Sequence, residues 1–293
     1  MDDRLRPLAA RVERAPYCAR LGVVVEAIAE DRVTVRVPYR DENSNPGRAL
    51  HGGVAASTID VAGVLAAWTA HPEGTAEAGT LDLAVDYLAA AIGEDIVAEA
   101  EVLRRGKEIV YCDVDVRNDG GKAIAKGLVT HRTLERGSAP PPADRQRVSM
   151  AEPSVEEGDV PPLAKAIVSV PFMKGLGLRI AHMRDGHAVV QMPFTADKSV
   201  DGEAIHEGAL AALLDTTGAM ASWSIVGLDL RHKASTVGIH VSYHGPAAGE
   251  DVVAEARTWR RNNEIFLNQV VVSGRTSERV VATGTVTYRI VVP

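Results

Sequence analysis

Alternating apolar and polar residues mark several segments of the chain as β-strands. These segments are rich in β-branched residues and span 31–37, 110–116, 252–256 and 280–292. The segment at about 53–69 differs, because apolar side chains would occupy nearly every face of the helix that it forms. Such a helix is surrounded by protein, whereas a surface helix shows a single apolar stripe. The pattern therefore predicts strands packed around a central helix.

The chain contains this pattern twice. The segment at 51–68 returns at 206–223, which is 155 positions later, and beyond the helix the offset becomes 156. Solenoid repeats are typically about 20 to 50 residues long, so this longer period instead gives two domains of about 130 residues, each able to bury a core. We expect domains at 1–134 and 162–293, joined by a linker at 135–161 that is rich in Pro, Ala and Ser.

Each half is thus predicted to be an α+β domain in which an antiparallel sheet wraps around one long helix. This is the arrangement of the hotdog fold. Two such domains in one chain would pair with each other as two hotdog subunits usually do. The predicted architecture is therefore an intramolecular pseudo-dimer of tandem hotdog domains.

Composition narrows the class of protein. The net charge is −7 and 46% of the residues are hydrophobic, which is typical of a soluble globular protein and leaves no basic surface for nucleic acid or an anionic membrane. The first residues lack the apolar stretch of a secretory signal, and no apolar run approaches the roughly 18 to 20 residues that span a bilayer. Neither Cys18 and Cys112 nor the histidines have metal-ligand spacing. We expect a cytoplasmic protein with reduced cysteines, no metal and no membrane.

The repeated helix start carries the candidate chemistry. Asp60 and Asp215 occupy matching positions, nine residues after His51 and His206. Small residues flank each Asp on one helix face, which leaves a gap that a ligand can enter. An ionised carboxylate among apolar residues needs a partner or shifts its pKa upward. Each Asp could simply brace the opposite helix, but the recurrence of the whole pattern favours catalysis.

Helix geometry pairs each Asp with the other half of the chain. Gly52 and Gly53 begin the first helix, where unpaired backbone N–H groups and the positive end of the helix dipole suit an oxyanion. Asp60 follows seven or eight residues later, roughly 10 to 12 Å away, which is too far to act on the same carbonyl group. Its partner amides should therefore come from the second half.

Two composite sites follow from this pairing. The expected members are Asn45, His51, Gly52 and Asp215 in the first site, and His206, Glu207 and Asp60 in the second. The second site departs from the first at two places. Val200 stands where the first half has Asn45, and Glu207 replaces a glycine. The site built on His206 should therefore be the weaker one.

The first half resembles the hotdog thioesterases of the phenylacetic-acid-degradation type. The motif of that family is Asn, then His-Gly-Gly at the start of the helix, then Asp nine residues after the His. Asn45, His51 and Asp60 match it fully, whereas the second half lacks the Asn and has Glu207 in place of a Gly. The resemblance covers both halves of the chain.

The resemblance implies hydrolysis of acyl-coenzyme A (acyl-CoA) thioesters. The Gly52 amide would polarise the thioester carbonyl, an Asp would act as general base or nucleophile, and the Asn would position water. His51 would orient the loop rather than transfer a proton. CoA is part of the substrate, and no other cofactor is expected. The candidate CoA contacts are Gly53, Gly208 and four basic residues in matching turns, Arg105, Lys107, Arg260 and Arg261, which could also simply be solvated.

Two other functions stay open. An enoyl-thioester hydratase or dehydratase of this fold can use an Asp-x-Asn-Pro-x-His loop, and residues 41–47 contain the Asn-Pro pair without that His. A non-catalytic acyl-CoA-binding protein would need an output module, for which the residues before Tyr17 leave little room. The sequence does not choose between fatty and aryl acyl groups. We expect a homodimer of tandem chains.

Overall fold

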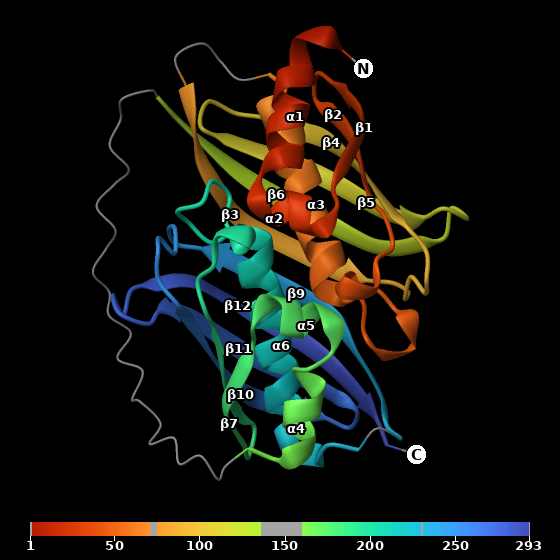
Figure 1. Ribbon diagram of the computed structural model, residues 1–293, viewed down its shortest axis with the longest axis vertical. Helices are drawn as coiled ribbons and strands as arrows, with labels where there is room; N and C mark the ends of the chain where they lie inside the picture. The colour runs from red at the N-terminus through yellow and green to blue at the C-terminus, as the bar shows by residue number, and fades with distance from the viewer. Residues whose placement is uncertain (1, 71–74, 136–159, 230, 293) are drawn as a thin grey trace.

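The computed structural model describes residues 2–70, 75–135, 160–229 and 231–292, and its helices lie on one face of a single 12-stranded sheet (Figure 1). Most of the predicted linker, residues 136–159, lies outside the described residues. The N-terminal half occupies the upper part of the view and the C-terminal half the lower part. Each half has two short helices, two strands, one long helix and four further strands.

The elements follow in the same order in both halves. Those of the first half are α1 Arg6–Arg14, α2 Pro16–Leu21, β1 Val24–Ala29, β2 Arg32–Val37, α3 Gly52–Trp68, β3 Thr75–Tyr87, β4 Ile96–Arg105, β5 Ile109–Asn118 and β6 Ala123–Glu135. Those of the second half are α4 Pro162–Ile167, α5 Pro171–Leu176, β7 Arg179–Arg184, β8 His187–Met192, α6 Glu207–Val226, β9 Lys233–Tyr243, β10 Val252–Asn262, β11 Ile265–Gly274 and β12 Val280–Val291. Short 3₁₀ turns are η1 Asp3–Leu5, η2 Asp41–Asn43, η3 Pro46–Arg48 and η4 Ala196–Lys198.

The two halves share one continuous antiparallel sheet. The strand order is β1-β2-β4-β5-β6-β3-β9-β12-β11-β10-β8-β7, so β3 and β9 join the halves at the centre. Their register pairs Asp82 with Ser242 and Asp86 with Gly238. The side chain of Asp82 also accepts a hydrogen bond from Ser242 and lies 2.8 Å from Nε2 of His240, both on the other half. The predicted pseudo-dimer of hotdog domains is confirmed.

The central helices α3 and α6 pack against each other in antiparallel fashion near their starts. A Cβ atom added to Gly53 would lie 2.5 Å from Cβ of Ala212, and one added to Gly208 would lie 2.6 Å from Oγ of Ser57. Larger residues at either glycine would therefore force the helices apart. Because Gly53 lies near Ala212 while Ser57 lies near Gly208, each helix start faces the middle of the other helix.

Helix α6 corrects one expectation from the sequence. Residues Glu207–Val226 form a helix of 20 residues whose length and composition would suffice to cross a membrane, although no apolar run of that length was expected. However, 83% of its most apolar window is buried inside the protein. Its apolar character is therefore that of a helix enclosed by its own domain.

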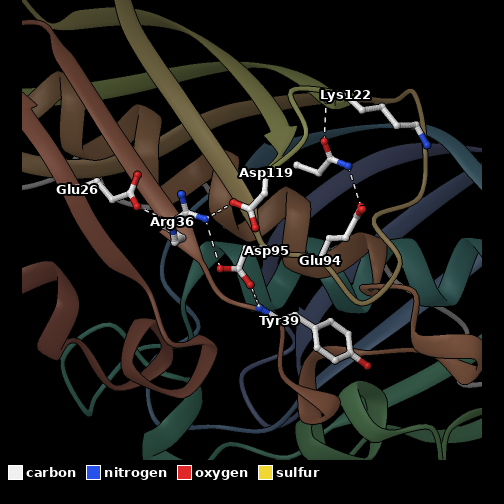
Figure 2. Close-up of polar contacts among 8 residues, drawn as sticks. Glu26, Arg36, Tyr39, Glu94, Asp95, Asp119 and Lys122 are labelled. Atoms are coloured by element: carbon white, nitrogen blue, oxygen red, sulfur yellow. Dashed lines mark hydrogen bonds and ion pairs between the residues drawn. The ribbon is translucent and has the colours of Figure 1, made fainter.

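A polar network joins β1, β2 and the loops next to β4 and β5 (Figure 2). Arg36 on β2 contacts three carboxylates, those of Glu26, Asp95 and Asp119. Asp95 also accepts a hydrogen bond of 2.8 Å from the backbone N–H of Tyr39. Arg36 therefore joins β1, the end of β2, the loop before β4 and the loop after β5.

The loop before β4 in turn fixes the loop that precedes α3. The N–H of Leu50 donates to the carbonyl of Ala91 at 2.9 Å, and the N–H of Gly93 donates to the carbonyl of Arg48 at 2.8 Å. These bonds place the segment that carries Asn45. Equivalent bonds join residues 203–205 to 247–249 in the second half.

Candidate active site

The first composite site forms where Asp215 of α6 meets the start of α3. Oδ2 of Asp215 lies 3.3 Å from the position that a Cβ atom on Gly52 would take. Asn45, His51, Gly52 and Asp215 all line one cavity of about 490 Å³. The fold thus brings together the four residues that the sequence assigned to one site from opposite halves.

His51 caps the helix and leaves one amide for a ligand. Its Nδ1 accepts a hydrogen bond of 2.9 Å from the N–H of Gly53, and its ring stacks on Phe172 of α5 with centroids 4.6 Å apart. Burial lowers the pKa of His51 to about 4, so the ring is neutral and keeps the lone pair that this bond requires. The N–H of Val54 donates to the His51 carbonyl. Among the described residues, the N–H of Gly52 has no acceptor and is available to an oxyanion.

Asp215 is buried, with 4% of its surface exposed. Its Oδ1 accepts a hydrogen bond of 2.6 Å from Oγ1 of Thr236 on β9. Burial raises the pKa of Asp215 to about 6, and the bond from Thr236 opposes this rise because it stabilises the ionised form. The carboxylate is therefore ionised at neutral pH and is a stronger base than a solvated one.

Sequence analysis missed Thr236 and its counterpart Thr80. Oγ1 of Thr80 on β3 donates to Oδ1 of Asp60 at 2.7 Å, so each half supplies an Asp together with the Thr that orients it. The two threonines recur at the offset of 156 positions, which was a usable signal. They were overlooked because threonine in a strand is ordinarily explained by its β propensity.

Two tyrosines fix the helix starts from β3 and β9. The hydroxyl of Tyr87 donates to the carbonyl of Gly52 at 3.2 Å, and that of Tyr243 donates to the carbonyl of Glu207 at 3.0 Å. Burial raises the pKa of both hydroxyls well above the ordinary value, so they stay protonated as donors. Each helix start is thereby held against the strand that joins the halves.

The second composite site lies where Asp60 of α3 meets the start of α6. Nδ1 of His206 lies 3.8 Å from Oδ2 of Asp60 and accepts a hydrogen bond of 3.0 Å from the N–H of Gly208. Burial lowers the pKa of His206 to about 4, as for His51. Asp60, His206 and Glu207 line a cavity of about 680 Å³.

The second site holds two carboxyl groups where the first holds one. Burial and the nearby charge of Glu207 raise the pKa of Asp60 to about 8. Ligand atoms of Asp60, His206 and Glu207 all lie within 4.8 Å of one another, although the sequence predicted no metal-binding cluster. The Nδ1 lone pair of His206 already accepts the Gly208 bond, which leaves the two carboxyl groups as the reactive pair.

Both halves of the chain match the sequence model of a known family. The sequence model of the thioesterase superfamily matches the chain twice, at residues 47–125 and 202–281. The chain belongs to the thioesterase superfamily. Human acyl-coenzyme A thioesterase 13 is 32% identical over 134 residues, which are 44% of this chain and 94% of that protein. A medium/long-chain acyl-CoA thioesterase from Escherichia coli is 34% identical over 136 residues, which are 41% of this chain and 86% of that protein.

Solved structures show that the tandem arrangement of this thioesterase-superfamily chain has precedents. A protein with a hot dog fold from Alicyclobacillus acidocaldarius superposes with a TM-score of 0.65 at 18% identity, covering 96% of this chain and 98% of that one. An acyl-CoA thioesterase II from Mycobacterium marinum gives a TM-score of 0.61 at 15% identity, covering 92% of this chain and 96% of that one. These likenesses concern the fold.

Two of the basic residues predicted to contact CoA, Arg105 and Arg261, have structural partners in this thioesterase-superfamily chain. Arg105 belongs to β4 rather than to a turn, and it donates to the carbonyl of Ala67 at the end of α3 and contacts Asp31. Arg261 lies on β10, where its guanidinium sits over the ring of Phe266. Among the described residues that line the two cavities, none is Arg105, Lys107, Arg260 or Arg261.

The glycine at the third position of each motif, Gly53 or Gly208, also has a structural explanation. Gly53 and Gly208 lie at the crossing of α3 and α6, where the helices leave no room for a side chain.

Two other basic residues, Arg11 and Arg14 of α1, line the second cavity. No Arg or Lys is among the described residues that line the first cavity, so the described linings of the two cavities differ in charge as well as in their carboxyl groups.

Proposed function

We propose that this chain hydrolyses acyl-CoA thioesters to a free acid and CoA, and that the first composite site is where it does so. The observation that carries the proposal is the position of the Asp215 carboxylate beside the start of α3, 3.3 Å from where a Cβ on Gly52 would lie. The names of the human and Escherichia coli relatives support acyl-CoA as the substrate class.

In the proposed mechanism the thioester carbonyl oxygen accepts a hydrogen bond from the N–H of Gly52 at the positive end of α3. Asp215 takes a proton from water as the water oxygen attacks the carbonyl carbon. When the tetrahedral intermediate collapses, the C–S bond breaks and the proton on Asp215 passes to the thiolate of CoA. Thr236 holds the Asp215 carboxylate in position through its hydrogen bond of 2.6 Å. Asn45, which lines the same cavity, is assigned to hold the attacking water.

The cavity leaves room for an apolar acyl group. Its walls include Ile96, Ile124, Met173, Met220 and Trp223. Trp223 follows Asp215 by two helical turns, roughly 12 Å along α6. The indole N–H of Trp223 donates to the hydroxyl of Tyr288 at 3.2 Å, which fixes the far wall. We assign the acyl group to this space and the CoA portion to the side of Asn45.

Measurement of thiol release from a panel of acyl-CoA substrates tests the proposal. Asp215→Asn keeps the size of the side chain but removes the base, and should lower kcat by about 10²-fold or more. Asp185→Asn is the matched control, because Asp185 has a side chain that is 86% exposed and a positive φ that Asn tolerates. Parental kcat in a folded Asp215→Asn protein would refute the assignment.

A single turnover in water labelled with heavy oxygen distinguishes the two possible roles of Asp215. A general base directs the label into the released acid alone. A nucleophilic carboxylate would form an anhydride with the acyl group, and hydrolysis of that anhydride can leave the label on Asp215 itself. Mass spectrometry of the Asp215 peptide reads the outcome, and a labelled peptide would replace the general-base step by the nucleophilic one.

We also propose that two tandem chains associate through the sheet face that the helices leave uncovered. Tyr111, Leu128 and Val237 are exposed hydrophobic residues on β5, β6 and β9. A mass measurement in solution should give twice the 31.1 kDa of one chain. A single-chain mass at micromolar concentration would contradict the association without affecting the catalytic proposal.

A further inference from the structure

The second composite site differs from the first at two positions that face each other. Glu207 replaces Gly52 at the helix start, and Gly79 on β3 replaces Ser235 on β9. A Cβ atom on Gly79 would lie 3.2 Å from Oε1 of Glu207, and Gly79 has a φ of +96°. The glycine therefore provides the space that the Glu207 carboxylate occupies. The two replacements act as a matched pair, which is not the pattern of a site that has simply lost residues.

The second site also has Val200 where the first has Asn45, but it keeps its buried Asp and the Thr that bonds to it. Asp60 is 1% exposed and keeps its bond from Thr80, and the cavity of about 680 Å³ is larger than that of the first site. Val61, Val64 and Trp68 supply an apolar wall, and Arg11 and Arg14 supply cationic groups. Such a cavity fits an apolar chain attached to an anionic carrier, as in an acyl-CoA thioester.

The two carboxyl groups stand in unlike environments. Glu207 is the first residue of α6, where the helix dipole stabilises a negative charge, and its side chain is only partly buried. Asp60 lies deeper, nine residues into α3, among apolar residues. With ligand oxygens within 4.8 Å, both groups cannot easily be ionised together. A single proton shared by the pair therefore resides mainly on Asp60, whose pKa is raised by burial and by the nearby Glu207.

We propose that the second site adds water reversibly across the C2=C3 double bond of an α,β-unsaturated acyl thioester. The Glu207 carboxylate takes a proton from water as the water oxygen forms a bond to C3. The π electrons move to C2 and onto the thioester oxygen, which lies at the start of α6. Asp60 then donates its proton to C2, giving the 3-hydroxyacyl thioester. The proton on Glu207 passes back to Asp60 through solvent, which restores the pair, so the sum of the reaction is the addition of one water molecule.

This inference shares the substrate class of the proposed hydrolysis but uses different residues, so the two can be tested separately. The first experiment follows the loss of the conjugated enoyl-thioester absorbance with trans-2-enoyl-CoA substrates of four, eight and twelve carbons, and identifies the product by mass spectrometry. Thiol release is recorded in the same samples. The parent and Asp215→Asn should hydrate the substrate at rates within about twofold of each other, because Asp215 belongs to the first site.

Variants of the carboxylate pair supply the decisive measurement. Glu207→Gln should lower the hydration rate by about 10²-fold or more, and Asp60→Asn should do the same. Glu207 is partly exposed, so Glu207→Gln should fold normally, which thermal unfolding checks. Gly79→Ser should also reduce hydration, because the added side chain displaces the Glu207 carboxylate.

Three results would overturn the proposal. They are the absence of hydration by the parent with all three substrates, an unchanged rate in folded Glu207→Gln, and loss of hydration in Asp215→Asn. Hydration without thiol release would refute hydrolysis alone, and thiol release without hydration would refute this inference alone. The double variant Glu207→Gly with Gly79→Ser gives these two positions the residues of the first site and should hydrate no better than Glu207→Gln.

Discussion

The two composite sites of this chain have the same scaffold, but their buried Asp residues differ in protonation at neutral pH. In both, a His caps a helix start, a Tyr holds its first carbonyl, and a Thr bonds to an Asp from the other half. The first site has a lone carboxylate with a pKa of about 6, whereas in the second site the nearby Glu207 helps to raise the pKa of Asp60 to about 8. The carboxyl group at the first residue of α6 therefore adds to burial in favouring the protonated form of Asp60.

Gly52→Glu should have the largest effect on this difference, because it gives the first site the carboxylate pair of the second. The new side chain would start 3.3 Å from Oδ2 of Asp215, where its charge should raise the Asp215 pKa and its bulk should block the carbonyl of the substrate. We expect thiol release to fall by about 10²-fold. Glu207→Gly is the control and should leave thiol release within about twofold, since it alters the other site. Equal effects of the two changes would end the distinction between the sites.

The composite pairing of the sites could be predicted from sequence for a geometric reason. A rise of about 1.5 Å per residue separates Asp60 from Gly52 by too great a distance for them to act together, and the repeat provided a second helix start. The same regularity could have shown Thr80 and Thr236. The contact of Glu207 with Gly79 could not be foreseen, because it depends on how the two halves meet.

The predicted role of the basic residues illustrates a second limit. The sequence predicts Arg105 in a turn between strands, yet Arg105 is the last residue of β4 and pairs with Val110. At that point it reaches the end of α3, where its guanidinium bonds to the carbonyl of Ala67. Charge pattern alone does not distinguish a solvated turn from a cation that binds a helix C-terminus.

The pH dependence of hydrolysis should identify which Asp is responsible. Asp215 must be ionised to accept a proton, so kcat/KM for thiol release should fall about tenfold per pH unit below about 6 and level off above it. Hydration at the second site needs Asp60 protonated, and it should instead decline as the pH rises through about 8. Measuring the rates of thiol release and of hydration against pH in one protein preparation checks both predictions. A thiol-release profile that rises only near pH 8 would assign hydrolysis to Asp60.

Removal of the bond from Thr236 should have a smaller effect in the same direction. Thr236→Val keeps the shape of the side chain but deletes the donor that stabilises ionised Asp215, so the Asp215 pKa should rise. Thiol release should then fall by about tenfold near pH 6.5 and by less at pH 9, where the carboxylate is ionised in any case. Thr80→Val is the matched control at the second site. A uniform loss at every pH would mean that Thr236 positions the carboxylate without tuning its pKa.

The smallest effect concerns stability and follows from the raised pKa of Asp60. Folding favours its protonated form, so the folded chain binds more protons than the unfolded chain between the ordinary pKa of 3.8 and about 8. The contribution of Asp60 to stability is therefore fully present below that window and is lost as the pH rises through about 8. Asp60→Asn lacks this loss, so its Tm relative to the parent should rise by a few degrees between pH 5 and pH 9, since about 1 kcal/mol moves the Tm of a domain of 150 to 250 residues by about 2 to 4 °C. Thermal unfolding at both pH values decides the matter, with Asp185→Asn as the exposed control. A difference that stayed constant with pH would mean that Asp60 is ionised throughout, which would remove the shared proton on which the contrast between the two sites depends.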